Sequence, residues 1–108
     1  MMKRVIVPLL LSGLAVTSQT AFADTEKLQA LLQKNNCVAC HMIDKRKYGP
    51  KLVEVAAKYA NDSGAVGKLA KKNKAGGTGV WGEDIMPPQA HVSDADAKTM
   101  AEYILALK

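Results

Sequence analysis

Apolar residues recur at helical spacing in four stretches of the chain, and no stretch shows the sustained alternation that is typical of a β-strand. The four stripes are Leu28, Leu31 and Leu32; Leu52, Val55, Ala56 and Tyr59; Val66, Leu69 and Ala70; and Ala97, Met100, Ala101, Ile104 and Leu105. Asp24 or Thr25 is placed to cap the first helix, and Asn35-Asn36 ends it. The pattern predicts an all-α domain of about four helices.

Turn and capping signals delimit the later helices and the longest loop. The cluster at residues 61–64 stops the second helix, and Ser93 with Asp96 resembles a capping box at the start of the last one. Between residues 74 and 92 the chain carries four glycines and two prolines without a helical stripe. A loop of that size in a small domain is usually functional, so we expect site residues in it.

The N-terminal segment has the three parts of a secretory signal. Lys3 and Arg4 give a positive start, an apolar-rich run covers residues 5–16, and Ala21-Phe22-Ala23 has the small-x-small pattern of a cleavage site. The apolar run is shorter than the roughly 20 residues of a membrane-spanning helix, so no stable membrane anchor is expected. We expect residues 1–23 to be a cleaved signal peptide and residues 24–108 to form the mature domain.

Charge and size narrow the classes of function. The full chain has a net charge of +5, and loss of Lys3 and Arg4 leaves 13 basic residues against 10 acidic ones. That surplus is too small to argue for nucleic-acid binding, but it favours docking on an acidic protein surface. The 85 residues after the cleavage site have four aromatic side chains and two cysteines, too few for a large core or a disulfide framework. A cofactor is the expected source of further buried apolar mass.

The most specific motif of the chain is Cys37-Val38-Ala39-Cys40-His41. C-x-x-C-H is the signature for covalent attachment of c-type haem. The spacing lets both sulfurs reach the two vinyl groups of one porphyrin, and the adjacent imidazole then lies beneath the ring, where it can bind the iron. We therefore predict one covalently bound haem c.

Three other chemistries use part of the same motif. A dithiol oxidoreductase also has C-x-x-C, but it is expected on a strand–helix sandwich rather than on this helical pattern. A zinc site formed by Cys37, Cys40, His41 and His91 would use two adjacent residues as ligands, which is unusual. A plain disulfide would explain neither the histidine nor the thin core. The haem interpretation is preferred over all three.

The second iron ligand must come from another part of the chain. Met42 is too close to His41 to reach the opposite face of a ring, and Met100 belongs to the apolar stripe of the last helix. Met86 precedes two prolines, which stiffen the loop and limit excursions of a sulfur held against iron. His91, at the approach to the last helix, is the other candidate. We predict Met86, because His/Met ligation suits a closed electron-transfer site.

The order of short motifs resembles that of the short bacterial class I cytochromes c, the cytochrome c-551/c-552 group. C-x-x-C-H is followed by Gly-Pro, Val-Ala-x-Lys-Tyr-Ala, Gly-Val-Trp-Gly and Met-Pro-Pro, and the similarity covers essentially all of residues 24–108. This resemblance implies a small single-domain all-α class I cytochrome c fold, with about four helices around one covalently attached haem. The members of that group are soluble periplasmic electron carriers rather than enzymes.

The resemblance implies roles for individual residues. Cys37 and Cys40 would form the thioethers, and His41 and Met86 would be the axial ligands of the iron. Pro50 matches a proline whose carbonyl accepts a hydrogen bond from the proximal imidazole, which fixes the orientation of the ring.

Four further positions are compared with the same group. Trp81 matches a tryptophan whose indole N–H binds a haem propionate, and Lys72 lies where relatives have a basic residue near the propionates. Asp84 departs from a more apolar, proline-rich pattern and bears on loop stability or propionate titration. Gln89 follows Met-Pro-Pro where relatives can have Asn, whose amide contacts the methionine sulfur; whether Gln89 makes that contact is open.

The expected function is one-electron transfer between periplasmic redox proteins by Fe(III)/Fe(II) cycling with unchanged ligands. A nitrite reductase, a cytochrome c peroxidase and a terminal oxidase are candidate partners, and docking should be transient. Lys34, Lys45 and Lys51 are expected to steer acidic partners. The alternatives are a haem enzyme or ligand sensor with an exchangeable sixth position, which depends on Met86, and a dithiol oxidoreductase.

Overall fold

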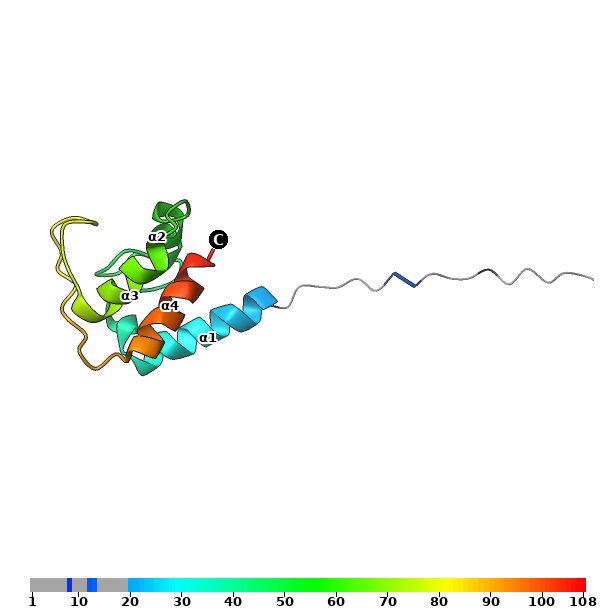
Figure 1. Cartoon of the computed structure of the whole chain (residues 1–108), viewed down its shortest axis with the longest axis horizontal. Coiled ribbons are helices and arrows are strands. Elements are labelled where there is room, and N and C mark those ends of the chain that lie inside the picture. The colour runs from blue at the N-terminus through cyan, green and yellow to red at the C-terminus, as the bar shows by residue number, and fades with distance from the viewer. Residues whose placement is uncertain (1–7, 9–11, 14–19) are drawn as a thin grey trace, which may run out of the picture.

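The computed structural model describes residues 8, 12–13 and 20–108, so most of the expected signal peptide lies outside the described residues. The described part forms α1 (Thr20–Lys34), the 3-10 turn η1 (Cys37–Ala39), α2 (Leu52–Lys58), α3 (Ala65–Ala75) and α4 (Asp94–Leu105). Figure 1 shows α2, α3 and α4 packed together, with α1 below them and the long loop between α3 and α4 along one side. The predicted all-α fold of about four helices is confirmed, and none of the helices described is both long and apolar enough to cross a bilayer.

Every predicted stripe contributes to one hydrophobic core. Its buried members are Leu28 and Leu32 from α1; Leu52 and Val55 from α2; Leu69 from α3; and Val92, Ala97, Met100, Ala101 and Ile104 from α4 and its approach. The other large members of the stripes, such as Leu31 and Tyr59, are partly buried at the edge of this core. Burial of one large apolar side chain contributes roughly 1.5–3 kcal/mol, so packing between these faces holds the helices together.

α1 begins earlier than the sequence predicts. The helix runs back through Ala21-Phe22-Ala23 to Thr20, so Asp24 lies inside it rather than at its start. The expected cap at Asp24 or Thr25 is wrong for the uncut chain, because alanine favours continued helix and nothing in this segment stops it. The predicted cleavage after Ala23 stays a prediction.

At the N-terminus of α4, one of the two hydrogen bonds of a capping box is present. The Ser93 hydroxyl oxygen accepts a hydrogen bond from the Asp96 N–H at 3.1 Å. The Asp96 carboxylate does not complete the box but pairs with Lys34 at 2.9 Å and accepts a hydrogen bond from the Asn35 amide at 3.3 Å. The same amide donates to Leu31 O at 2.9 Å. The start of α4 is therefore tied to the end of α1, immediately before the cysteine motif.

Candidate haem-binding site

A cavity of about 1190 Å³, its open mouth included, lies between the four helices, η1 and the long loop. Much of its wall is apolar, with Leu32, Leu52, Val55, Leu69 and Ile104 coming from all four helices. All seven site residues predicted from the sequence line this cavity: Cys37, Cys40, His41, Pro50, Lys72, Trp81 and Met86. Residues that are up to 49 positions apart in the chain are thus brought to one place.

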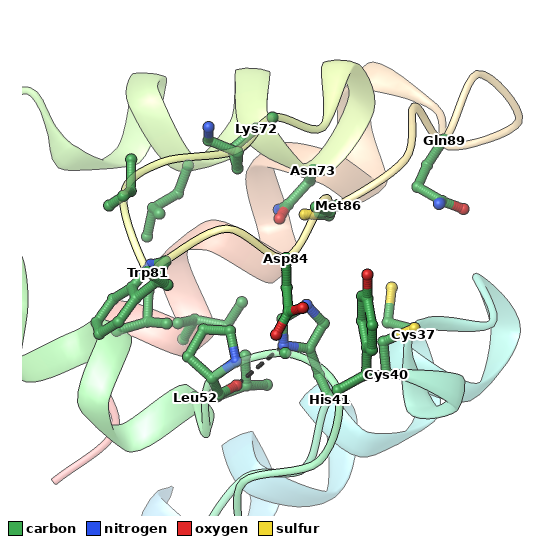
Figure 2. A pocket seen from close by; sticks show the side chains of 18 of the residues that line it. Cys37, Cys40, His41, Leu52, Lys72, Asn73, Trp81, Asp84, Met86 and Gln89 are labelled. Atoms are coloured by element: carbon green, nitrogen blue, oxygen red, sulfur yellow. Dashed lines mark hydrogen bonds between the residues drawn. The ribbon is translucent and has the colours of Figure 1, made fainter.

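The cysteine motif forms a single tight turn. Asn36 has a left-handed backbone (φ 59°, ψ 27°) that turns the chain out of α1 and into η1. The N–H groups of Cys40 and His41 both donate to Cys37 O, at 3.1 and 2.9 Å. Figure 2 shows both thiols and the imidazole gathered on the same part of the cavity wall. One turn of backbone therefore presents two free sulfurs and one imidazole to a shared ligand.

The environment of the Cys37 thiol does not suit a dithiol oxidoreductase. Burial of Cys37, and second the nearby Cys40, raises the pKa of the Cys37 thiol above its ordinary value. Redox-active C-x-x-C sites lower this pKa instead, because the thiolate is the reactive form. The described residues also lack the strands of the sandwich that such enzymes use.

The orientation of His41 is set by the segment that follows the motif. The imidazole Nδ1 lies 3.0 Å from Pro50 O, and because a carbonyl only accepts, Nδ1 carries the proton. The unprotonated nitrogen is then Nε2, which is the form that binds a metal. Gly49, whose N–H donates to Cys40 O at 2.8 Å, packs against the ring: a side-chain carbon there would lie 2.9 Å from Nε2 and closer still to Nδ1 and Cε1.

Met86 lies on the α3 side of the cavity, and Figure 2 shows it across the cavity from His41. The other candidates for a second ligand are engaged elsewhere. His91 is exposed, does not line the cavity, and has its Nε2 3.0 Å from Asn35 O. Met42 is 41% exposed and lies outside the cavity. Met100 also lines the cavity, but it is buried in the core on α4, and its Sδ lies 4.0 Å from the Asn35 amide. Met86 reaches the cavity from the loop, opposite His41.

Trp81 and Lys72 both line the cavity, and Lys58 lies beside Trp81. Trp81 is half-buried in the wall, and Lys58 Nζ lies 5.4 Å from the centre of its ring, a cation–π distance. Lys72 comes from α3 and places its Nζ against Gly77. The cavity is thus lined by an indole and by a lysine, whose N–H and ammonium groups suit the carboxylates of a large ligand.

The structure adds wall residues that sequence reasoning missed. Asn73 lines the cavity from α3 and donates to Ala97 O of α4 at 3.0 Å; its position four residues after Leu69, on the apolar stripe, was the available signal. Arg46, which the sequence analysis did not single out, also lines the cavity, and its guanidinium lies 3.8 Å from the carboxylate of Asp84, which was singled out. Arg46 and Asp84 lie in different loops, 38 positions apart in the chain, so no local sequence pattern indicates that they are close in space.

Gln89 lies apart from Met86 in Figure 2. Its side-chain amide donates to Pro87 O at 3.1 Å, so this amide is used within the loop. The zinc alternative also lacks support, because among residues 8, 12–13 and 20–108 no three His, Cys, Asp or Glu side chains are close enough to hold a metal ion.

Two free thiols and an imidazole with a fixed tautomer, in a cavity with an apolar wall and a thioether, fit a covalently attached haem. Fold and site thus define a small all-α haem protein. The family model described as Cytochrome c matches residues 25–108. The chain belongs to the cytochrome c family, as one of its short class I members.

The similarity to individual cytochromes is high. Cytochrome c-552 of Nitrosomonas europaea is 53% identical over 78 residues, which cover 72% of this chain and 76% of that protein. Cytochrome c-551 of Stutzerimonas stutzeri is 43% identical over 107 residues, 99% of this chain and 100% of that protein. The crystal structure of wild-type Nitrosomonas europaea cytochrome c552 has a TM-score of 0.73 at 51% identity, over 74% of this chain and 99% of that chain.

These findings establish the general function. The chain is a monohaem electron carrier with one covalently attached haem c, and it exchanges electrons with redox partner proteins. It is not an enzyme, which removes the haem-enzyme alternative. The resemblance on which the sequence analysis relied is confirmed.

Proposed function

We propose that this protein is a periplasmic one-electron shuttle in which Cys37 and Cys40 hold the haem and His41 and Met86 bind its iron. The observation that carries the proposal is that an imidazole and a thioether line one cavity from different elements, with both thiols on the same wall. Bound haem supplies an iron that alternates between Fe(III) and Fe(II). The residues of the chain determine which groups bind that iron and which molecules can reach it.

His41 and Met86 are both neutral ligands in this proposal. Pro50 O keeps the proton on Nδ1, so Nε2 of His41 stays available in both redox states, and the ring cannot turn without losing the 3.0 Å hydrogen bond. The apolar side chains of the wall, with Leu52 and Ile104 among them, exclude water from the site. A dry site with unchanged ligands has little to rearrange when the charge changes, which suits rapid electron exchange.

Trp81 and Lys72 are proposed to hold the propionates. The indole N–H donates to a carboxylate oxygen, and the Lys72 ammonium neutralises its charge. Lys58, over the Trp81 ring, holds the indole in place and adds a second positive charge to that part of the site.

The periplasm is the proposed location. The charged start, apolar run and Ala21-Phe22-Ala23 of the precursor support export and cleavage after Ala23. Covalent attachment of haem suits an exported protein, because a small domain with a thin core would otherwise release its cofactor. The mass of the mature protein from a periplasmic extract tests this: an N-terminus at Asp24 is expected, and an intact Met1 would contradict it.

Docking is proposed to be weak and guided by charge, with a nitrite reductase, a cytochrome c peroxidase or a terminal oxidase as partner. Of the three lysines expected to steer, Lys34 is paired with Asp96 and Lys51 is 3.6 Å from Glu54. Lys45 has no carboxylate within 4.0 Å in the described part of the chain, so its charge is uncompensated. We infer that, of these three lysines, Lys45, just after the haem-binding motif, contributes most to the steering field.

The spectrum of the purified protein tests the ligand set. The oxidised protein is expected to show the weak far-red band of sulfur–Fe(III) charge transfer. Met86→Ala should lose this band, keep its haem, have a lower reduction potential and bind CO when reduced. Met42→Ala, an exposed methionine outside the cavity, is the matched control and should change none of these. An oxidised wild type without the band, which binds CO readily once reduced, would instead favour a ligand sensor.

A further inference from the structure

The backbone of Met86 is hydrogen-bonded to the end of α3. The Gly77 N–H donates to Met86 O at 2.9 Å, and the Met86 N–H donates to Gly77 O at 2.8 Å, which makes an isolated antiparallel bridge. Beyond the two prolines, the Gln89 N–H donates to Lys74 O, the last lysine of α3, at 2.7 Å. Three backbone hydrogen bonds thus hold both sides of the Met-Pro-Pro segment against the C-terminal turn of one helix.

Gly76 allows the two segments to come this close. Its N–H donates to Lys72 O at 2.9 Å, and its backbone (φ 66°, ψ −159°) lies in a region that is open in practice only to glycine. A side-chain carbon at this position would lie 2.8 Å from the carbonyl carbon and oxygen of Pro87 and closer still to Met86 O. These are backbone atoms, so they cannot swing aside as the tip of a side chain does. Any other residue at position 76 must push the Met86 segment away from α3.

α3 is a firm support for this segment. Leu69 is buried in the core, and the Asn73 amide donates to Ala97 O of α4 at 3.0 Å. By contrast, most residues between the two ends of the bridge, 78–85, are exposed, with half-buried Trp81 as the exception. The position of the Met86 thioether is therefore set by a packed helix pair and not by the exposed loop that precedes it.

We propose that Gly76 and Gly77 are positioning residues for the axial thioether: together they clamp Met86 to the end of α3 and hold its sulfur at the iron. The inference rests on the proposed function in taking Met86 as the ligand. The clamp orders the methionine before iron is bound, so ligation does not have to fix a mobile loop. It keeps the sixth position closed, which an electron carrier needs.

The test compares Gly76→Ala with Gly82→Ala in the full haem-containing protein. Gly82 lies in the same loop and also has a positive φ (111°), but a side-chain carbon there meets no atom within 4 Å, and Gly82 does not line the cavity. Both variants carry an unfavourable φ, and only Gly76→Ala displaces Met86. Gly76→Ala is expected to keep its haem, lose most of the far-red band, have a lower reduction potential and bind added imidazole roughly tenfold more tightly or better. Gly82→Ala should resemble the wild type; a full band and unchanged potential in Gly76→Ala would overturn the inference.

Amide hydrogen exchange on the wild-type protein keeps the inference testable if Gly76→Ala does not mature. The N–H groups of Gly77 and Met86 should exchange as slowly as those of α3, and far more slowly than that of exposed Gly82; equal exchange at the three sites would show that no clamp exists. The Met86→Ala variant separates the two proposals. If it keeps the band, the ligand is wrong; if it loses the band while Gly76→Ala keeps it, only the clamp fails.

Discussion

Replacement of Asn35 by alanine is expected to destabilise the protein at the junction between α1, η1 and α4. Asn35 is 4% exposed and is the buried polar residue among the core residues described. Its amide donates to Leu31 O at 2.9 Å and to Asp96 Oδ2 at 3.3 Å, and it lies 4.0 Å from Met100 Sδ. The alanine variant loses all of these contacts two residues before the first cysteine of the haem motif.

The loss of unfolding free energy in Asn35→Ala depends on which hydrogen bonds the two acceptors, Leu31 O and the Asp96 carboxylate, retain. A hydrogen bond to a neutral carbonyl contributes about 0.5–1.5 kcal/mol, and one to a carboxylate about 1.5–3 kcal/mol. Neither acceptor is orphaned, because Leu31 O keeps the Asn35 N–H at 3.1 Å and Asp96 keeps Lys34. The carboxylate bond is also long, so the lower end of each range applies, and the loss of unfolding free energy should be about 2 kcal/mol.

Guanidinium denaturation of the oxidised haem protein at pH 7, followed by far-UV circular dichroism, measures this loss. The midpoint should fall with an unchanged dependence on denaturant, because the unfolded surface is the same. Gln33→Ala, an exposed position on the same helix, is the control and should change stability by less than about 0.5 kcal/mol. An Asn35→Ala variant as stable as this control would refute the reasoning that the buried amide ties the two helices together.

Two further predictions concern charged groups. The hydrogen bond from Lys34, and second that from Asn35, lowers the pKa of the Asp96 carboxyl below its ordinary value. The stabilisation by the charged Asp96 carboxylate is therefore present above about pH 4 and is lost as pH falls through its lowered pKa in the folded protein. The unfolding free energy should therefore drop more between pH 6 and 3 in the wild type than in Asp96→Asn. Parallel plots of unfolding free energy against pH for the two proteins would contradict this. Lys45→Glu should slow oxidation by anionic ferricyanide and speed oxidation by a cationic cobalt complex at low salt, with both effects fading as salt is added. Lys108→Glu makes the same change of charge after the end of α4 rather than next to the haem-binding motif, and equal effects from the two variants would argue against a local steering site.

Local sequence signals predicted the helices and the cysteine motif well, because neighbours in the chain decide them. The stripe of Leu52 and Val55 lies on one face of α2 by the geometry of a helix, whatever it packs against. The Cys37 and Cys40 thiols share one turn because two residues separate them. The predicted start of α1 was wrong, because a capping residue such as Asp24 marks only a possible helix start. The residues before it determine whether the helix extends further back.

Contacts between distant segments lay beyond sequence reasoning. The local sequence around Gly76 and Gly77 predicts a loop, and no pattern in it indicates that these residues lie against the Met86 segment. His91 was a plausible ligand until the fold placed it on Asn35 O, 56 residues away. Lys34 likewise has the carboxylate of Asp96 beside it, 62 positions further along the chain, which no local pattern indicates.

The amino-acid sequence by itself determined which residues form helices and placed two thiols and an imidazole on one turn. The spacing of these three residues also indicated covalent haem attachment. These depend on backbone geometry and spacing over a few residues. Only the tertiary structure decided where Met86 lies relative to His41, which glycines lie against its segment and which lysines are paired with a carboxylate. Such features arise when packing of the apolar helix faces brings distant backbone segments within hydrogen-bonding distance, and no short stretch of sequence contains that information.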